Sequence, residues 1–200
     1  MTGWTRHQGR AVALPAENID TDQLIAARFM SAPREDGYGD KLLYDARHDE
    51  AGAPIDHPLN RWPGASVLIA GRNFGCGSSR EAAVYALFDH GFRAVLAPGF
   101  GDIFAANAAN NGLLAAEIGA REAATLINAL RECDGPAEID LAAQRFAVAG
   151  VTGGFAVDPV RRVKLMKGWD DIDLTADRGA EIAAFRAAYA ARAPWATPRG

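Results

Sequence analysis

SVLIAGRNFGCGSSRE, at residues 66–81, is the stretch that decides the fold. Its first half is an apolar run that ends in glycine, which is typical of a buried strand. A helix is expected over residues 79–89, because Val84, Leu87 and Phe88 share one face at i, i+3 and i+4. The stretch therefore predicts a buried strand, a glycine-rich turn and a helix, in that order.

The same alternation continues toward the C-terminus. The sequence predicts further strands at residues 93–97 and 113–116, helices at 102–109 and 121–131, and a strand hairpin at 138–149 that turns near Ala143–Gln144. Strands that alternate with helices are typical of layered domains built on parallel strands. We therefore expect an α/β fold with a partly parallel sheet that is flanked by helices.

The two ends of the chain have less regular patterns. We expect a single domain over residues 1–200, in which 1–65 is an irregular N-terminal part, 66–150 is the α/β core and 170–200 is a C-terminal helical segment. In the N-terminal part only Val12–Leu14 predicts a short strand. The C-terminal segment predicts one helix with Asp177 near its start, with Ile182, Phe185 and Tyr189 on one face, and with its end at Ala193–Pro194.

Composition excludes several classes of protein. The 200 residues carry 21 Lys and Arg against 25 Asp and Glu, a net charge of −4, which argues against nucleic-acid binding. No apolar run approaches the roughly 18 residues of a membrane span, and residues 1–10 have no apolar signal segment, so we expect a cytoplasmic protein. Two cysteines, Cys76 and Cys133, and four scattered histidines predict no metal site on this chain.

The turn at residues 71–80 has the properties of an anion site. The backbone of Gly75, Cys76 and Gly77 is able to approach a ligand closely because glycine has no side chain. The following helix start would offer backbone amides and the positive end of its dipole. Arg80, with Arg72 as a second candidate, adds charge that grips a carboxylate.

Other interpretations of this turn remain open. Ser78 and Glu81 have the spacing of a capping box, so Ser78 could serve only to start the helix, and this is compatible with an anion site. A phosphate-binding P-loop is disfavoured because the turn has no lysine, and a dinucleotide fingerprint lacks its third glycine. Cys76 as a nucleophile has no histidine nearby in sequence.

Four motifs together resemble one known family. They are NIDTDQLI at 18–25, GRNFGCGSSRE at 71–81, APGFGDIFAANAANNGLL at 97–114 and GWDDIDLT at 168–175. In their order and spacing they are similar to the small subunits of 3-isopropylmalate dehydratase, the swivel domain of the aconitase superfamily. The resemblance covers most of the chain and implies a layered, swivelling β/β/α domain.

The resemblance also implies a reaction. The family interconverts 2-isopropylmalate and 3-isopropylmalate by dehydration and rehydration in leucine biosynthesis. A [4Fe–4S] cluster sits on a separate large subunit, so this chain would be active only in a heterodimer or larger assembly. By carry-over, Ser78 would act as the alkoxide base, and Ser79 and Arg80 would bind a substrate carboxylate.

Three further residues follow from the resemblance, and one motif departs from it. Thr21 and Asp22 match a Thr-Asp pair near the family's site and would bind substrate, although they could equally be a helix cap. Arg34 matches a substrate-binding arginine, in a segment that helps to recognise the substrate's side group. Many members have His-Ala-Pro-Trp-Ala after Arg-Glu, whereas this chain has AAVYA at 82–86. One alternative is therefore a substrate of the methylmalate, dimethylmalate or homoaconitate type. Another alternative is a non-catalytic anion-binding domain.

Overall fold

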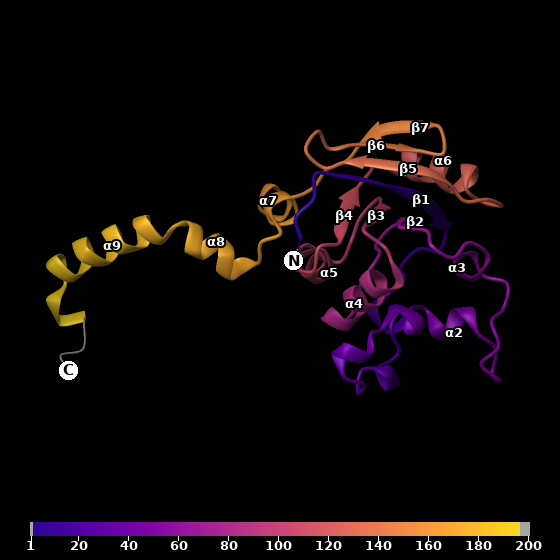
Figure 1. Cartoon of the computed structure of the whole chain (residues 1–200), viewed down its shortest axis with the longest axis horizontal. Coiled ribbons are helices and arrows are strands. Elements are labelled where there is room, and N and C mark those ends of the chain that lie inside the picture. The colour runs from indigo at the N-terminus through magenta and orange to yellow at the C-terminus, as the bar shows by residue number, and fades with distance from the viewer. Residues whose placement is uncertain (1, 197–200) are drawn as a thin grey trace.

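A computed structural model describes residues 2–196, and at its centre lies a mixed sheet of seven strands (Figure 1). The strands are β1 (Arg6–Leu14), β2 (Val67–Ala70), β3 (Ala94–Ala97), β4 (Leu114–Glu117), β5 (Gly135–Asp140), β6 (Arg145–Val148) and β7 (Val151–Gly154). Their order is β4-β3-β2-β1-β5-β6-β7. The strands from β4 to β1 pair in parallel, and those from β1 to β7 pair antiparallel. The expected partly parallel α/β sheet is therefore confirmed.

Helices cover both faces of the parallel strands. The helices before the C-terminal segment are α1 (Thr21–Leu24), α2 (Tyr44–Arg47), α3 (Pro58–Arg61), α4 (Glu81–His90), α5 (Asp102–Asn110) and α6 (Ala120–Ala129). They are followed by α7 (Pro159–Lys167), α8 (Asp171–Asp177) and α9 (Gly179–Arg192), of which α8 and α9 do not cover the sheet. Alternate residues of β2 enter two separate cores, because Leu68 packs with the α1 and α4 side and Ile69 with the α6 side. Strands buried on both faces explain why the sequence of β2 is continuously apolar.

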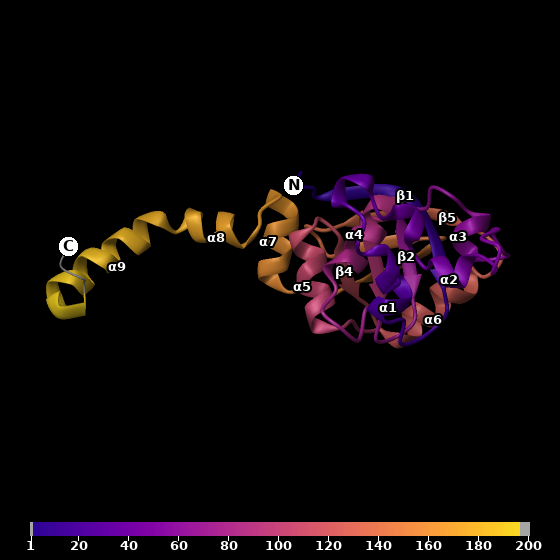
Figure 2. The same ribbon diagram turned by 90° about the horizontal axis from the view of Figure 1, so that it is seen from below.

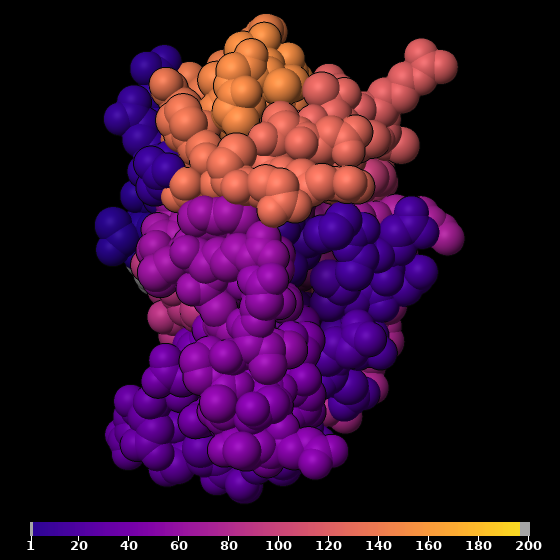
Figure 3. Space-filling view, turned by 90° about the vertical axis from the view of Figure 1, so that its right-hand side faces the viewer, coloured from indigo at the N-terminus to yellow at the C-terminus, as the bar shows by residue number. Residues whose placement is uncertain are grey.

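The first strand is longer and more central than the sequence predicts. Instead of three residues at 12–14, β1 spans nine and joins the two halves of the sheet. Residues 11–14 pair in parallel with β2, and residues 6–11 pair antiparallel with β5. Charged and polar residues alternate in its first half, where every second side chain is exposed. This half-buried pattern is why the sequence does not predict the whole strand. The rest of the N-terminal part holds short helices and loops, which cover the lower part of the face in Figure 3.

The C-terminal segment contains more elements than expected. Strand β7 and helix α7 were not predicted, although Asp158–Pro159 is a typical helix start, and the single predicted helix is two helices, with Asp177 at the end of α8. Residues 197–200 of the predicted segment lie outside the described residues. Lys164 on α7 is buried and forms an ion pair with Asp171, the first residue of α8, which fixes the N-terminus of that helix. Beyond this ion pair, α8 and α9 project away from the sheet (Figures 1 and 2).

Within the described part of the chain, no helix has the length and apolarity needed to cross a membrane.

The projecting helix α9 contributes no buried side chain, so its removal is expected to leave the sheet stable. Truncation after Asp177 should change the free energy of unfolding by less than about 0.5 kcal/mol, the usual range for surface changes. Ile69→Ala is the control, because it empties part of the core and should cost about 2–5 kcal/mol. Urea unfolding followed by circular dichroism measures both. A truncated chain as unstable as the control would show that α9 packs against the sheet.

Candidate functional site

The glycine-rich turn at residues 71–80 connects β2 to α4 at the carboxyl end of the parallel strands. On one side it pairs with the segment that precedes α1. Gly75 N–H donates to Ile19 O at 2.7 Å, and Thr21 N–H donates to Cys76 O at 3.0 Å. These bonds use the backbone of Gly75 and Cys76 to anchor the turn, so the two residues position the site rather than offering all their amides to a ligand.

On its other side the turn pairs with the loop after β3. Phe74 N–H donates to Gly99 O at 3.0 Å, and Gly101 N–H donates to Phe74 O at 2.9 Å. Phe74 itself is fully buried, with its ring edge against the ring of Phe104. The turn is thus held between two segments that are distant in the sequence.

Gly75 is required by both its backbone and its surroundings. Its φ is +69°, and a Cβ atom at this position would lie 2.2 Å from the ring of Phe104. A Cβ on Gly101 would similarly lie 2.5 Å from the carbonyl oxygen of Gly75. Glycine permits the left-handed backbone and the close approach together.

The predicted capping box is wrong. Helix α4 begins at Glu81, its N-cap is Arg80, and no side chain caps it. The reason is a turn just before the helix, in which Arg80 N–H donates to Ser78 O at 2.9 Å. Glu81 instead accepts a hydrogen bond from Asn111 at 2.8 Å. Ser78 therefore lies outside the first turn of α4, where the helix dipole acts on it more weakly.

The two serines of the turn are exposed and unengaged. Within residues 2–196, neither the Ser78 nor the Ser79 hydroxyl forms a hydrogen bond. The carbonyl of Ser78 accepts a hydrogen bond from Thr21 Oγ1 at 2.9 Å, and Thr21 is only 2% exposed. The structure therefore shows Thr21 supporting the backbone of the turn, while both serine hydroxyls are available to a ligand.

Arg80 lies beside these serines and contacts one carboxylate. Its side chain is 21% exposed, and its Nη1 atom lies against Asp22 Oδ1 without the alignment of a hydrogen bond. Arg72, the second candidate cation, pairs instead with Glu17, with 2.8 Å between Nε and Oε2. Of these two arginines, Arg80 directly follows the serines in the chain and contacts Asp22, whereas Arg72 is held by Glu17.

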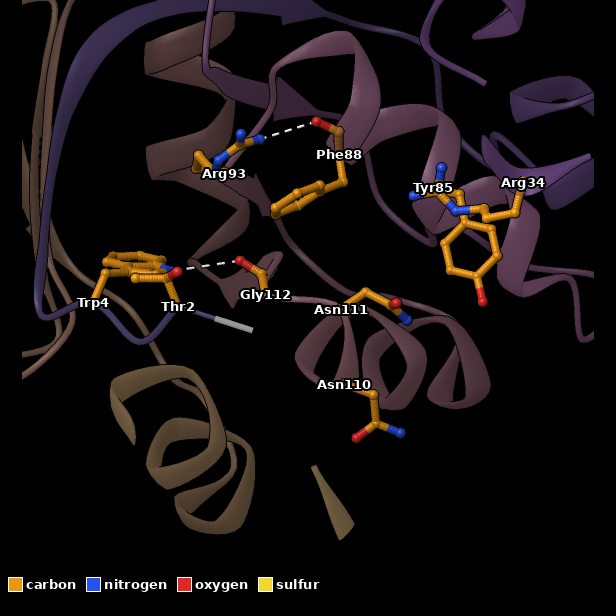
Figure 4. A pocket seen from close by; sticks show the side chains of 9 residues that line it. All are labelled: Thr2, Trp4, Arg34, Tyr85, Phe88, Arg93, Asn110, Asn111 and Gly112. Atoms are coloured by element: carbon orange, nitrogen blue, oxygen red, sulfur yellow. Dashed lines mark hydrogen bonds between the residues drawn. The ribbon is translucent and has the colours of Figure 1, made fainter. Parts of the chain in front are cut away.

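Arg34 is not brought to the turn. It donates two hydrogen bonds to Asp89, at 2.6 and 2.9 Å, and stacks over the ring of Tyr85. Asp89 lies nine residues beyond Arg80 along α4, which corresponds to about 13 Å. Arg34 and Tyr85 line one side of a cleft of about 620 Å³, across from Trp4 (Figure 4).

A second hollow, of about 490 Å³, borders Asp22 but is chemically unsuited to a dicarboxylate. Asp20, Asp22 and Asp45 all line it, so it would repel an anion. His57 also lines it, and burial lowers the pKa of its imidazole to about 4. The lowered pKa keeps the ring neutral near pH 7, and its Nδ1 accepts a hydrogen bond from Leu59 N–H at 3.2 Å.

Neither cysteine belongs to a cluster of metal-binding side chains. Cys76 is half-buried in the turn and Cys133 is exposed after α6, and both are free thiols. Among the residues that the structure describes, no group of three or more His, Cys, Asp or Glu side chains is arranged to hold a metal ion.

Comparison with known proteins identifies the family. The model of the aconitase C-terminal domain matches residues 1–121. Over 199 residues the chain is 42% identical to the 3-isopropylmalate dehydratase small subunit of Caulobacter vibrioides, with 98% of each chain covered. The chain belongs to the 3-isopropylmalate dehydratase small-subunit family.

Other members of the family agree over nearly the whole length. A 3-isopropylmalate dehydratase small subunit of Bordetella pertussis is 40% identical, with 100% of this chain and 99% of that one covered. The crystal structure of 3-isopropylmalate dehydratase from Methanocaldococcus jannaschii has a TM-score of 0.65 and 27% identity, and covers 90% of this chain and 99% of that one. The expected family and the layered α/β fold are therefore confirmed.

Sequence patterns missed two parts of this small-subunit site. The Arg80–Asp22 contact joins residues 58 positions apart, and nothing in either motif marks the pairing. The Phe104 ring that closes over Gly75 comes from α5. The sequence did contain an indication of the Phe104 contact, because the motif at 97–114 includes both Gly101 and Phe104.

Gly75→Ala should destabilise this small subunit by about 1–3 kcal/mol, since the new methyl group would overpack against Phe104 at a left-handed backbone position. Gly99→Ala is the matched control, because a Cβ there meets nothing within 4 Å and its φ is not positive. Thermal and urea unfolding of the two variants test this. Equal stability of both would mean that the turn is not tightly held.

Proposed function

We propose that this protein is the small subunit of 3-isopropylmalate dehydratase, a hydro-lyase that interconverts 2-isopropylmalate and 3-isopropylmalate in the leucine biosynthesis of the cytoplasm. It acts only with a large subunit. The observation that carries the proposal is the turn after β2, where Ser78 and Ser79, two exposed serines without a hydroxyl hydrogen bond within residues 2–196, directly precede Arg80 in the chain. Near-complete alignment with bacterial small subunits supports the same reaction.

Ser78 is the proposed base. Its Oγ atom, as an alkoxide, takes the proton from the carbon next to a substrate carboxylate. The electron pair of that C–H bond forms the double bond, and the hydroxyl on the neighbouring carbon leaves and, once protonated, is released as water. Addition of water in the opposite sense gives the isomer. A serine hydroxyl is a weak acid, so the alkoxide requires nearby positive charge and exclusion of water.

Ser79 and Arg80 are proposed to hold the carboxylate beside the reacting carbon. A guanidinium presents two parallel N–H donors that match the two oxygens of a carboxylate. The same positive charge favours the alkoxide of Ser78. Because Ser78 is outside the first turn of α4, the charge of Arg80 and closure against the large subunit must supply most of this stabilisation.

The residues of this chain do not fit an iron–sulfur cluster. Such a cluster is usually held by three or four thiolates, and Cys76 and Cys133 are only two, one in the turn and one beyond α6. We therefore place the [4Fe–4S] cluster on the large subunit, where its chemistry is to polarise the leaving hydroxyl.

Arg34 and Thr21 have indirect roles in this proposal. Arg34 is held by Asp89 at the far end of α4, so it reaches a substrate on Arg80 only if its segment, within residues 23–38, moves when the large subunit binds. That segment is proposed to bound the side group of the substrate. Thr21 supports the turn through Ser78 O rather than contacting the substrate.

The departure from the family motif at 82–86 consists of four packing residues and one residue, Tyr85, that contacts the segment of Arg34. Ala82, Ala83, Val84 and Ala86 are buried in the core beneath α4. Tyr85 stacks on Tyr38 and points toward the Arg34 cleft. Similarity over nearly the whole length to 3-isopropylmalate dehydratase small subunits is what favours isopropylmalate over another substituted malate. A panel of isopropylmalate, methylmalate, dimethylmalate and homoaconitate with the two-subunit enzyme tests the substrate, and no activity on any of them would favour a non-catalytic anion-binding domain.

Ser78→Ala should abolish turnover without loss of stability. A general base typically contributes about 10²–10⁴-fold to the rate, while the Ser78 hydroxyl has no hydrogen-bond partner within residues 2–196 whose loss would weaken the fold. Ser79→Ala is the matched control and should chiefly raise KM. Both are measured as kcat and KM of the reconstituted enzyme, together with melting curves. An active Ser78→Ala enzyme would refute the assignment of the base.

Arg80→Lys should weaken substrate binding by about 1.5–3 kcal/mol, the value of a charged hydrogen bond. Lysine keeps the charge but loses the two-point geometry. Arg72→Lys is the control, because Arg72 pairs with Glu17 outside the proposed contact. Steady-state kinetics of the two-subunit enzyme distinguish them, and normal KM for Arg80→Lys would contradict the proposed carboxylate contact.

A further inference from the structure

The contact between Arg80 and Asp22 puts a carboxylate of the protein on the guanidinium that is proposed to bind a carboxylate of the substrate. Asp22 is the second residue of α1, and its side chain is 53% exposed. The neighbouring Asp20 is already engaged, since its carboxylate caps α1 by accepting from Gln23 N–H at 2.7 Å. Of the two aspartates at the start of α1, Asp22 is thus the one that faces Arg80.

This contact has the properties of one that a ligand displaces. The Asp22 side chain is 53% exposed, so water reaches the ion pair from the Asp22 side and weakens it. The Arg80 Nη1 atom is buried, yet it forms no aligned hydrogen bond with Asp22 or with any other described residue. A free carboxylate would be able to align with two nitrogens of the guanidinium at once, which the tethered Asp22 does not do.

We propose that Asp22 is a positioning residue that occupies Arg80 in the empty site and that the substrate carboxylate displaces. The inference rests on the proposed function of Arg80. Asp22 then has two opposite effects. It holds the guanidinium beside Ser78 before substrate arrives, and its negative charge repels the incoming carboxylate. Asp22 is therefore not a ligand of the substrate carboxylate, in contrast to the role that the family resemblance implies.

Asp22→Asn separates these two effects. The amide oxygen of asparagine occupies the place of Asp22 Oδ1 beside Arg80, so the guanidinium stays in place, but the competing charge is gone. Binding of a carboxylate should become tighter. A direct ligand of the substrate hydroxyl would behave differently, because its loss would weaken substrate binding and leave the binding of a simple dicarboxylate unchanged.

The experiment measures inhibition of the reconstituted two-subunit enzyme by malonate, a dicarboxylate with neither hydroxyl nor side group. We expect Asp22→Asn to lower the inhibition constant of malonate about three- to tenfold, and Arg80→Lys to raise it at least tenfold. In the Arg80→Lys background, Asp22→Asn should have little further effect, since the competition acts through the guanidinium. Asp45→Asn is the control, because it removes the same charge from the same hollow but faces Arg28.

The outcomes distinguish the role of Asp22 from the proposed function of Arg80. An unchanged or higher inhibition constant in Asp22→Asn, with a raised one in Arg80→Lys, overturns the role of Asp22 and leaves the proposed function intact. An unchanged constant in Arg80→Lys overturns the proposed function itself. An equal effect of Asp45→Asn would show a general charge effect and also overturns the inference. If Asp22→Asn does not assemble, Asp22→Ser, which likewise removes the charge, is measured in its place.

Discussion

The turn after β2 is held by backbone hydrogen bonds to two segments that are distant in the sequence, and the site depends on this constraint. The segment before α1 fixes Gly75 and Cys76, and the loop after β3 fixes Phe74. Both segments follow neighbouring parallel strands, so the sheet brings them to the same edge. Because the backbone is fixed at these points, the position of the residues that follow is determined. These residues are the exposed Ser78 and Ser79 and their neighbour Arg80.

The arrangement separates rigid support from chemistry. Buried groups such as Thr21 and Phe104 support the turn, whereas the hydroxyls proposed to act on substrate have no partner within residues 2–196. This fits a site that is completed by a second protein, since half of a site must leave its reactive groups open. Arg34 is likewise apart from the turn, because it donates hydrogen bonds to Asp89 at the other end of α4. Its segment is part of the surface that the large subunit is proposed to reorganise.

The sequence predicts the parallel half of the sheet well, because β2, β3 and β4 are short apolar runs between clear helices and turns. It predicts β1 poorly, since half of that strand alternates in polarity and its pairing with β5 spans more than a hundred residues. In the site, the residue types were evident from the motif, but the helix start was misplaced. A serine three residues before a glutamate is a common cap, and only the tertiary bonds of the turn show that α4 begins later.

The central claim is that this turn holds the substrate carboxylate with Ser78 at the reacting carbon. A crystal structure of the two-subunit enzyme with a bound isopropylmalate analogue tests it most directly. The account predicts the carboxylate on the Arg80 guanidinium, Asp22 displaced from it, and Ser78 Oγ within about 3 Å of the carbon that loses its proton. An analogue bound in the Arg34 cleft, or held with Ser78 turned away from that carbon, would contradict the account.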